Sequence, residues 1–324
     1  MVKPTVISLF AGCGGSSLGY KWAGYKELLA IEWDDNAVKT FKLNFSKVPI
    51  WQKDIKKVTG KEIMNFLNIK KGELDLLDGS PPCQGFSTAG KRVVIDKRND
   101  LVNENIILID ELQPKVFVIE NVSGMIKGKM KGLFIEYIKK MKSLNYQVKC
   151  KLMNAKYYNV PQSRERVIFI GVRKDLEIKP SYTEGNNKII TVKEAFKNCK
   201  IGEVKYLKGN KANLIKKLKI GQNMSKLTKN KYFNTLRLNP NKVCPTIPKL
   251  FGEAWGSFFA HWESNRSISI NELKRLFTYS DDFIMIGTFK DQWAVIGNSV
   301  PPKFMQAIAE HIKKEILIKA ELIN

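Results

Sequence analysis

Short apolar runs alternate with helical patterns through the first 173 residues of the chain. Runs rich in β-branched or aromatic side chains, each bounded by glycine, proline or charge, predict buried strands at 6–10, 28–32, 74–78, 116–120 and 167–172. Positions with the helical period predict helices near 16–23, 35–44, 61–68, 101–112 and 129–144. Strands separated by helices are typical of a parallel sheet with right-handed crossovers and helices on both faces. The pattern therefore predicts a doubly wound α/β domain.

This alternation stops near Asp175. The segment 193–231 carries twelve lysines but only two acidic residues, Glu194 and Glu203. Apolar residues then repeat every three or four positions over 303–318, which predicts an amphipathic helix near the end of the chain. The pattern therefore divides the chain into an α/β part, a basic part and a helical end.

The composition is that of a folded protein with an excess of positive charge. Hydrophobic residues make up 44% of the 324 positions and charged residues 27%, which excludes a disordered or collagen-like chain. A formal net charge of +24 indicates a polyanionic partner such as nucleic acid. Because 47 of the 55 basic residues are lysine, and an AT-rich genome also produces that bias, the charge alone does not identify the partner.

Cysteine and histidine usage bears on the compartment and on metals. The five cysteines are odd in number and widely spaced, without a Cys-x-x-Cys pair, and the chain has two histidines. This pattern argues against a disulfide framework and a zinc site, and it fits a reducing compartment. The chain has no run of about 18 apolar residues, and its N-terminus makes a poor signal peptide. We therefore expect a cytoplasmic protein with no bound metal and no membrane partner.

A glycine-rich turn at 10–17 follows the first predicted strand and runs into a helix. Glycines such as Gly12 and Gly14 let the backbone approach a ligand closely, and a helix N-terminus favours negative groups. The third glycine of a dinucleotide fingerprint would fall on Ser17, which disfavours a nicotinamide cofactor. A tight turn without a ligand is the alternative.

Three further residues suit an adenosine group. Glu32 closes the second strand about twenty residues on, where a carboxylate can hold ribose hydroxyls. Trp33 could stack on a purine, unless it belongs to the core, and Asp54 could accept a hydrogen bond from an adenine amino group. The set favours an adenosine-containing ligand without a pyrophosphate.

Reactive side chains follow the later strands. Cys83 comes after two prolines just beyond the predicted strand 74–78, where α/β folds place their sites, although a lone cysteine is often a small core residue. Glu120 ends the next strand, and Arg164 and Arg166 precede the one after it. We therefore expect a thiol, a carboxyl group and two guanidinium groups to converge at one edge of the sheet.

Five segments together make a specific resemblance. They are Phe10-x-Gly12-x-Gly14-Gly15, Pro81-Pro82-Cys83-Gln84, Glu120-Asn121-Val122, Gln162-x-Arg164-x-Arg166 and Gly297-Asn298-Ser299-Val300-Pro301. In this order and at this spacing they resemble the motifs of the DNA cytosine-5 methyltransferase family. Each is weak alone, but together they span nearly the whole chain.

The resemblance implies a covalent mechanism for four residues. Cys83 would add to cytosine C6 as the nucleophile, which makes C5 able to attack a methyl group. Glu120 would bond N3 and the exocyclic amine, while Arg166, with Arg164 nearby, would contact the base oxygen and a flanking phosphate. The cytosine would be flipped out of the duplex, and the loop 84–100 would close behind it. The base that removes the C5 proton is not identified, and water is an alternative.

The resemblance also implies a Rossmann-like domain that binds S-adenosylmethionine and releases S-adenosylhomocysteine. The residues expected to hold this cofactor are Phe10, Gly12, Gly14, Glu32, Trp33, Asp54, Pro82, Leu101 and Asn298. Residues 1–175 would form the catalytic domain, 176–284 a smaller target-recognition domain, and 285–324 a segment that returns to the catalytic domain. The expected partner of this monomer is double-stranded DNA, with or without a cognate restriction endonuclease that acts separately.

Two alternatives keep the same fold. A tRNA cytosine-5 methyltransferase of the same superfamily usually carries Cys-Phe-Thr in the recognition region, and this tripeptide does not occur here. A catalytically inactive DNA-binding homologue is disfavoured because Cys83, Glu120 and Arg166 are all present.

Overall fold

The computed structural model describes residues 3–82, 100–126, 131–228, 235–252 and 258–323, and it divides the chain into two compact units. The larger unit consists of Met1–Asn154, Glu165–Glu184 and Met305–Asn324, and the smaller unit of Ala155–Arg164 and Gly185–Phe304. The division into domains at 175 and 284 stays a prediction.

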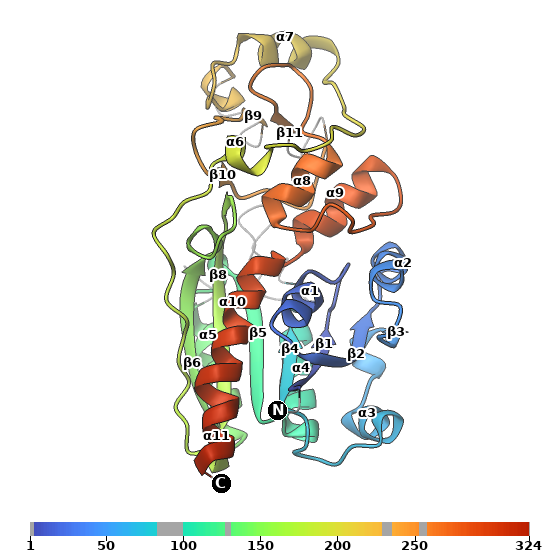
Figure 1. Ribbon diagram of the computed structural model, residues 1–324, viewed down its shortest axis with the longest axis vertical. Coiled ribbons are helices and arrows are strands. Elements are labelled where there is room, and N and C mark those ends of the chain that lie inside the picture. The colour runs from blue at the N-terminus through green and yellow to red at the C-terminus, as the bar shows by residue number, and fades with distance from the viewer. Residues whose placement is uncertain (1–2, 83–99, 127–130, 229–234, 253–257, 324) are drawn as a thin grey trace. The chain divides into compact units, whose positions relative to one another are not determined.

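The larger unit is built on a sheet in the order β3-β2-β1-β4-β5-β8-β6, seven strands among the described residues (Figure 1). The strands are β1 (Thr5–Leu9), β2 (Lys26–Glu32), β3 (Ile50–Gln52), β4 (Leu76–Gly79), β5 (Val116–Val122), β6 (Tyr146–Asn154) and β8 (Glu165–Arg173). The five strands predicted from apolar runs are confirmed, each within two residues at either end. Their runs are apolar because helices cover both faces of the sheet.

The direction of β8 corrects the expectation of a parallel sheet. The strands β3, β2, β1, β4 and β5 are parallel, but β8 is antiparallel to both of its neighbours, β5 and β6. The helix α5 (Lys131–Ser143) makes the crossover to β6, and the chain then returns into β8 without another crossover helix. A strand that follows such a direct return runs antiparallel to the strand before it.

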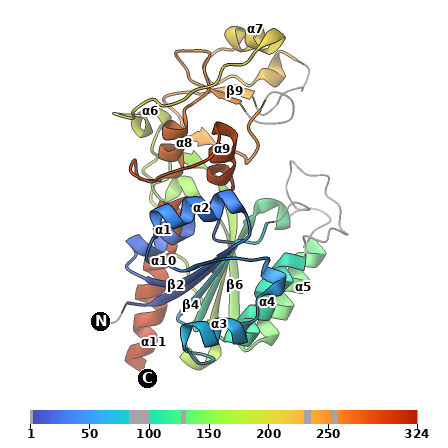
Figure 2. The ribbon, with the colours of Figure 1, turned by 90° about the vertical axis from the view of Figure 1, so that its right-hand side faces the viewer.

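Helices cover the two faces of this sheet. Figure 2 shows α3, α4 and α5 on one face and α1, α10 and α11 on the other. The bounds are α1 (Gly15–Trp22), α2 (Asp35–Asn44), α3 (Gly60–Leu67), α4 (Asp100–Leu112), α10 (Pro302–Ile312) and α11 (Ile318–Ile323), with a π-helical turn at Lys313–Leu317. The Tyr25 hydroxyl donates a hydrogen bond to the carbonyl of Ala309, 3.0 Å away, four residues before this turn.

The two faces of the sheet differ in polarity. Ile7, Leu77 and Ile119 pack with α3, α4 and α5 into the main hydrophobic core. Because side chains alternate along a strand, the residues next to them, among them Asp78 and Glu120, point to the face that carries α1. Buried polar groups of the larger unit are therefore concentrated on that face.

The smaller unit contains short elements. Its strands pair as β7 (Gln162–Ser163) with β10 (Cys244–Pro245) and β9 (Thr235–Arg237) with β11 (Phe258–Ala260). Its helices are α6 (Val192–Ala195), α7 (Gly209–Lys217), α8 (Ile270–Phe277) and α9 (Phe289–Asn298). The helix α8 begins with a capping box between Ser269 and Glu272, and Arg266 forms a buried ion pair with the same Glu272.

No helix within the described ranges is long and apolar enough to cross a membrane.

Candidate active site

The glycine-rich turn leaves the carboxyl end of β1 in an unusual backbone conformation. Phe10 and Gly12 both have φ near 55°, and Gly14 has φ 94°. Positive φ is rare for a residue with a side chain, and such strained positions cluster at functional sites. A Cβ on Gly14 would lie 2.3 Å from a ring carbon of Phe45, whereas a Cβ on Gly12 would meet nothing within 4 Å. The turn therefore packs tightly at Gly14 and faces open space at Gly12.

Glu32 binds this turn from the end of β2. One oxygen of its carboxylate accepts a hydrogen bond from the Gly12 backbone N–H at 2.8 Å. The other oxygen accepts from the N–H groups of Trp33 and Asp34, at 2.8 and 2.9 Å. Burial raises the pKa of Glu32, and the three hydrogen bonds oppose this rise. The oxygen bonded to Gly12 has acceptor capacity left for a ligand hydroxyl.

Trp33 is 73% exposed and is not a core residue. An exposed tryptophan beside a buried carboxylate presents a flat apolar surface next to a hydrogen-bonding group, which suits a ribose and its purine. Asp54, also exposed, begins a short 3-10 helix (Ile55–Lys57) and accepts a hydrogen bond from the N–H of Lys56 at 3.1 Å.

The other predicted cofactor residues lie on separate elements. Pro82 is partly buried and follows β4, and Leu101, in the first turn of α4, packs partly buried against the main core. Asn298 is exposed and ends α9 in the smaller unit. The structure thus brings Gly12 and Glu32 into direct contact, while the roles of Pro82, Leu101 and Asn298 stay predictions.

The predicted nucleophile, Cys83, lies outside the described residues, as do the basic positions 91–98 of the following loop. Glu120 and Arg166 are described, and they meet. The guanidinium Nε of Arg166 lies 2.6 Å from Oε1 of Glu120, and each side chain is 11% exposed. The two residues come from adjacent antiparallel strands, β5 and β8 (Figure 1). The expected carboxyl and one expected guanidinium therefore form a largely buried ion pair.

Arg164 has a different environment in the smaller unit. Its side chain is buried, and its guanidinium donates hydrogen bonds to the carbonyl groups of Ile247, Gly297 and Ser299 at 3.1, 2.9 and 3.1 Å. Two of these acceptors belong to the segment 297–301 that carries one of the sequence motifs. Arg164 therefore holds the backbone of that segment, whereas Arg166 holds a carboxylate.

A buried contact between α1 and β4 was not predicted from the sequence. The hydroxyl of Tyr20, on α1, donates a hydrogen bond to Oδ1 of Asp78, on β4, at 3.1 Å. Both residues are buried. The sequence does show a carboxyl group, that of Asp78, near the end of a buried strand, and a buried carboxyl group needs a hydrogen-bond partner. Nothing in the sequence identifies Tyr20 as that partner.

The smaller unit presents many lysines to solvent. Of the twelve between 193 and 231, nine are exposed, namely Lys193, Lys197, Lys200, Lys205, Lys208, Lys216, Lys217, Lys219 and Lys226. Lys229 and Lys231 lie outside the described residues. An array of exposed ammonium groups is the surface that a phosphate backbone would contact.

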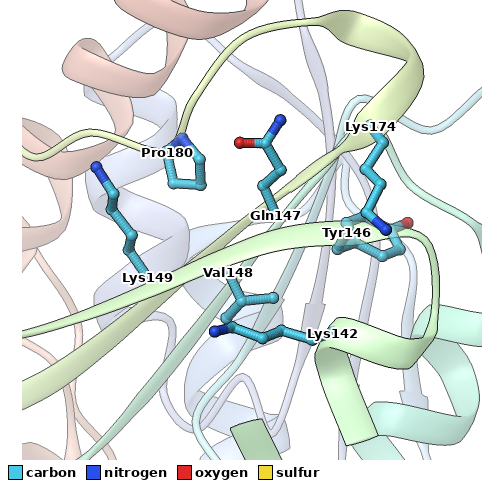
Figure 3. Close-up of a pocket in the computed structure, with 7 residues that line it drawn as sticks. All are labelled: Lys142, Tyr146, Gln147, Val148, Lys149, Lys174 and Pro180. Atoms are coloured by element: carbon cyan, nitrogen blue, oxygen red, sulfur yellow. The ribbon is translucent and has the colours of Figure 1, made fainter. Parts of the chain in front are cut away.

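A shallow hollow opens beside the start of β6, with Lys142, Lys149 and Lys174 on its walls (Figure 3). Tyr146, which also lines it, pairs with Arg173, at the end of the sheet where β5 begins. The hollow therefore lies near the start of β5, whereas Glu120 lies near the carboxyl end of the same strand. In the part of the chain that the structure describes, no group of three or more His, Cys, Asp and Glu side chains could hold a metal ion.

Comparison with known proteins gives consistent matches. Residues 4–314 match the family described as C-5 cytosine-specific DNA methylase. The chain is 33% identical to the Type II methyltransferase M1.HphI of Haemophilus parahaemolyticus, over 96% of this chain and 87% of that protein. It is also 33% identical to the putative Type II methyltransferase M.MJ0563P of Methanocaldococcus jannaschii, over 96% and 99%. A crystal structure of a putative DNA modification methyltransferase encoded within an E. coli prophage is similar with a TM-score of 0.79 at 25% identity, covering 97% of this chain and 100% of that one.

Proposed function

Because the chain belongs to the C-5 cytosine-specific DNA methylase family and is a DNA cytosine-5 methyltransferase of the restriction–modification type, we propose that it methylates a flipped-out cytosine through a covalent bond between Cys83 and C6. S-adenosylmethionine is the proposed methyl donor, and a specific duplex sequence is the proposed substrate. The observation that carries this proposal is the buried ion pair between Glu120 and Arg166.

The chemistry needs a group that supports attack on C6. Cytosine C5 is a poor nucleophile, so the Cys83 thiolate first adds to C6 and electron density moves to C5. When the carboxyl group of Glu120 carries a proton, it donates a hydrogen bond to N3, accepts one from the exocyclic amine, and so stabilises the negative charge that thiolate addition moves onto the ring. After methyl transfer a base removes the C5 proton, and elimination releases the Cys83 thiolate. The residue that accepts this proton is not assigned, and water is one acceptor.

Arg166 orients Glu120 for this role. The guanidinium Nε, 2.6 Å from Oε1, holds one carboxyl oxygen of Glu120 and leaves the second oxygen for the base. Because the pair is largely buried, water competes little with this contact. We assign Arg166 to the reacting site and Arg164 to the support of the segment 297–301, where its guanidinium meets backbone carbonyls.

The residues of the glycine-rich turn fit S-adenosylmethionine. Gly12 faces open space, Glu32 retains an acceptor beside it, and the exposed ring of Trp33 can stack on adenine. Phe10, Gly14, Asp54, Pro82, Leu101 and Asn298 complete the set that we propose for the cofactor. When bound, the cofactor supplies an electrophilic methyl group on a sulfonium centre. The chain itself holds the ribose and positions the adenine.

DNA is the substrate of this family, and the exposed lysines of the smaller unit suit its backbone. Lysine contacts to phosphates position a duplex and do not read its sequence. Extruding the target cytosine costs a few kcal/mol, which the binding energy of the complex must supply. We propose that 176–284 is the target-recognition domain. A monomeric state and a cognate endonuclease stay predictions.

One experiment tests this function. The purified full chain and radiolabelled S-adenosylmethionine are incubated in two separate reactions, one with duplex DNA of mixed sequence and one with tRNA. We expect label in DNA only, and none with Cys83→Ser, which keeps the size of the side chain but is a far weaker nucleophile. Label in tRNA only would overturn the DNA assignment, and label in neither would favour a DNA-binding homologue without activity. Bisulfite sequencing of the methylated DNA then identifies the recognition sequence.

A further inference from the structure

The contact between Tyr20 and Asp78 joins two elements that belong to different halves of the proposed site. The helix α1 begins at Gly15, so its first turn contains the last residues of the glycine-rich segment 10–17. The strand β4 ends at Gly79, four residues before Cys83. A displacement of α1 against β4 would therefore change the position of the cofactor turn relative to the start of the loop that carries Cys83.

Two residues of α1 bind the same carboxyl group. The Tyr20 hydroxyl donates to Asp78 Oδ1 at 3.1 Å, and the side chain of Ser16 also hydrogen-bonds Asp78. Ser16 and Tyr20 are four positions apart, so they lie on one face of the helix, one turn from each other. Two contacts one turn apart restrain both the distance of α1 from β4 and its rotation about its own axis.

The Asp78 carboxyl group lies where burial disfavours charge. Asp78 is 1% exposed, and within the described residues it forms no ion pair. Burial, with the nearby carboxylates of Glu27 and Glu120, raises the pKa of Asp78 to about 8. At neutral pH this group is mostly protonated, so it can accept one hydrogen bond and donate another. An asparagine side chain has the same pattern of one acceptor and a donor.

We propose that Asp78 is a positioning residue, which holds Ser16 and Tyr20 of α1 so that the cofactor turn keeps a fixed alignment with the carboxyl end of β4, four residues before Cys83. This inference rests on the proposed methyl transfer. Transfer needs donor and acceptor atoms in near-attack geometry, and a misplacement of about 1 Å can lower a rate about a hundredfold. Loss of the contact should therefore slow transfer more than it weakens the binding of either substrate.

Three measurements on the full-length protein separate alignment from binding. The first is the single-turnover rate of methyl transfer to duplex DNA at saturating substrates. The second is the dissociation constant for S-adenosylmethionine by calorimetry. The third is the release of tritium from cytosine C5 without methyl donor, which reports reversible addition of Cys83 to C6.

Four variants are compared. Tyr20→Phe and Asp78→Ala remove the contact. Asp78→Asn keeps an oxygen that accepts from Tyr20 and places an amide group beside Ser16, whose hydroxyl can accept as well as donate. Tyr25→Phe is the matched control, because Tyr25 packs edge-on against Tyr20 with ring centroids 5.4 Å apart. The control also loses a buried hydroxyl hydrogen bond, but one to the carbonyl of Ala309 and not to Asp78.

We expect Tyr20→Phe and Asp78→Ala to lower the transfer rate about tenfold or more, with cofactor binding and tritium release within about threefold of the unmodified protein. Asp78→Asn should restore most of the rate lost in Asp78→Ala, and Tyr25→Phe should keep the full rate. An unchanged transfer rate in Tyr20→Phe overturns the proposal. If Tyr20→Phe lowers all three quantities in parallel, and Tyr25→Phe lowers them equally, the contact has a merely structural role and the proposal is also overturned. If the unmodified protein transfers no methyl group to DNA, the proposed function itself fails, and this inference fails with it.

Discussion

Arg166 and Glu120 face each other across two antiparallel strands, with the guanidinium Nε 2.6 Å from the carboxylate Oε1. In the register of β5 and β8, Glu120 lies opposite Ile168 and Arg166 opposite Val122, so the charged pair is diagonal on one face of the sheet. Diagonal neighbours are within reach of long side chains. The pair depends on the reversed direction of β8, which places Arg166 near the carboxyl end of β5.

Removal of one partner should show how strongly the pair is coupled. Arg166→Ala leaves the Glu120 carboxylate largely buried without its cation, so we expect the free energy of unfolding to fall by about 3–5 kcal/mol. Urea denaturation measures this change. Lys140→Ala is the control, because it removes one partner of the exposed Glu136–Lys140 pair and should cost less than about 1 kcal/mol. Equal effects of the two variants would contradict the coupling.

The two arginines of the Gln-x-Arg-x-Arg motif should behave differently on substitution. Arg164→Leu leaves the carbonyls of Ile247, Gly297 and Ser299 without their donor, at about 1–3 kcal/mol for each buried group, so we expect poor folding or a much lower melting temperature. The transfer rate per folded molecule should change less than in Arg166→Lys, which keeps the charge but loses the planar fork. Calorimetry and active-site titration separate these effects. A normal melting temperature for Arg164→Leu would refute the supporting role.

The central strands could be predicted because both of their faces are buried. β5 begins with four consecutive apolar residues, and β1 and β4 contain shorter apolar runs interrupted by the buried polar residues Ser8 and Asp78. β6 was missed because it is an edge strand, and its middle residues, 149–152, are exposed and include Lys149 and Lys151. Lysines on an edge strand discourage pairing with other chains, but they also hide the apolar pattern. The direction of β8 was missed because apolar content carries no information on strand direction.

The candidate site could be predicted where a residue is part of a local motif. Glu32, Glu120 and Arg166 belong to short segments in which a carboxyl or guanidinium group follows or precedes a predicted strand, and this pattern is visible in the sequence. The bond between Tyr20 and Asp78 joins positions 58 apart in the chain, and it depends on which face α1 turns toward the sheet. No local pattern encodes that choice, since it follows from tertiary packing.

Two glycines of the same turn should respond differently to alanine. Gly12→Ala places a Cβ in open space at a positive φ, so we expect a small loss of stability, about 1–2 kcal/mol, and weaker cofactor binding. Gly14→Ala adds a Cβ that would meet the ring of Phe45 at 2.3 Å, so we expect a larger loss of stability. Thermal unfolding and calorimetric titration with S-adenosylmethionine measure the two effects. A Gly12→Ala protein with unchanged cofactor affinity would contradict the placement of the ligand.

The exposed lysines of the smaller unit should contribute to DNA binding through salt-dependent contacts. Lys208 precedes α7 and Lys216 lies in its last turn, and both are exposed. If both contact phosphates, changing them to glutamine should reduce the slope of log K against log salt by about 0.9 for each contact. Fluorescence anisotropy over a range of salt concentrations measures the slope. The control is Lys319→Gln, at an exposed lysine on α11 of the larger unit, and an identical slope in both variants would contradict the assignment.

The buried carboxyl group of Asp78 should make stability depend on pH. Its pKa is raised from an ordinary value of 3.8 to about 8, so between these values the folded state holds a proton that the unfolded state has released. The free energy of unfolding should therefore fall as the pH rises from about 4 to about 8, and level off above that. Glu27, whose pKa burial raises to about 7, adds a change of the same sign.

Asp78→Asn removes this dependence at one position. Relative to the unmodified protein, the variant should gain stability as the pH rises from 5 to 8, by at most about 1.4 kcal/mol for each pH unit. Urea denaturation at pH 5, 6, 7 and 8 gives the difference directly. Asp35→Asn is the control, because Lys39 beside that exposed carboxylate lowers its pKa, so the group is ionised in both states throughout this range. If the difference between Asp78→Asn and the unmodified protein stays constant over this range, Asp78 is ionised in the folded state and cannot donate the hydrogen bond that an asparagine would imitate.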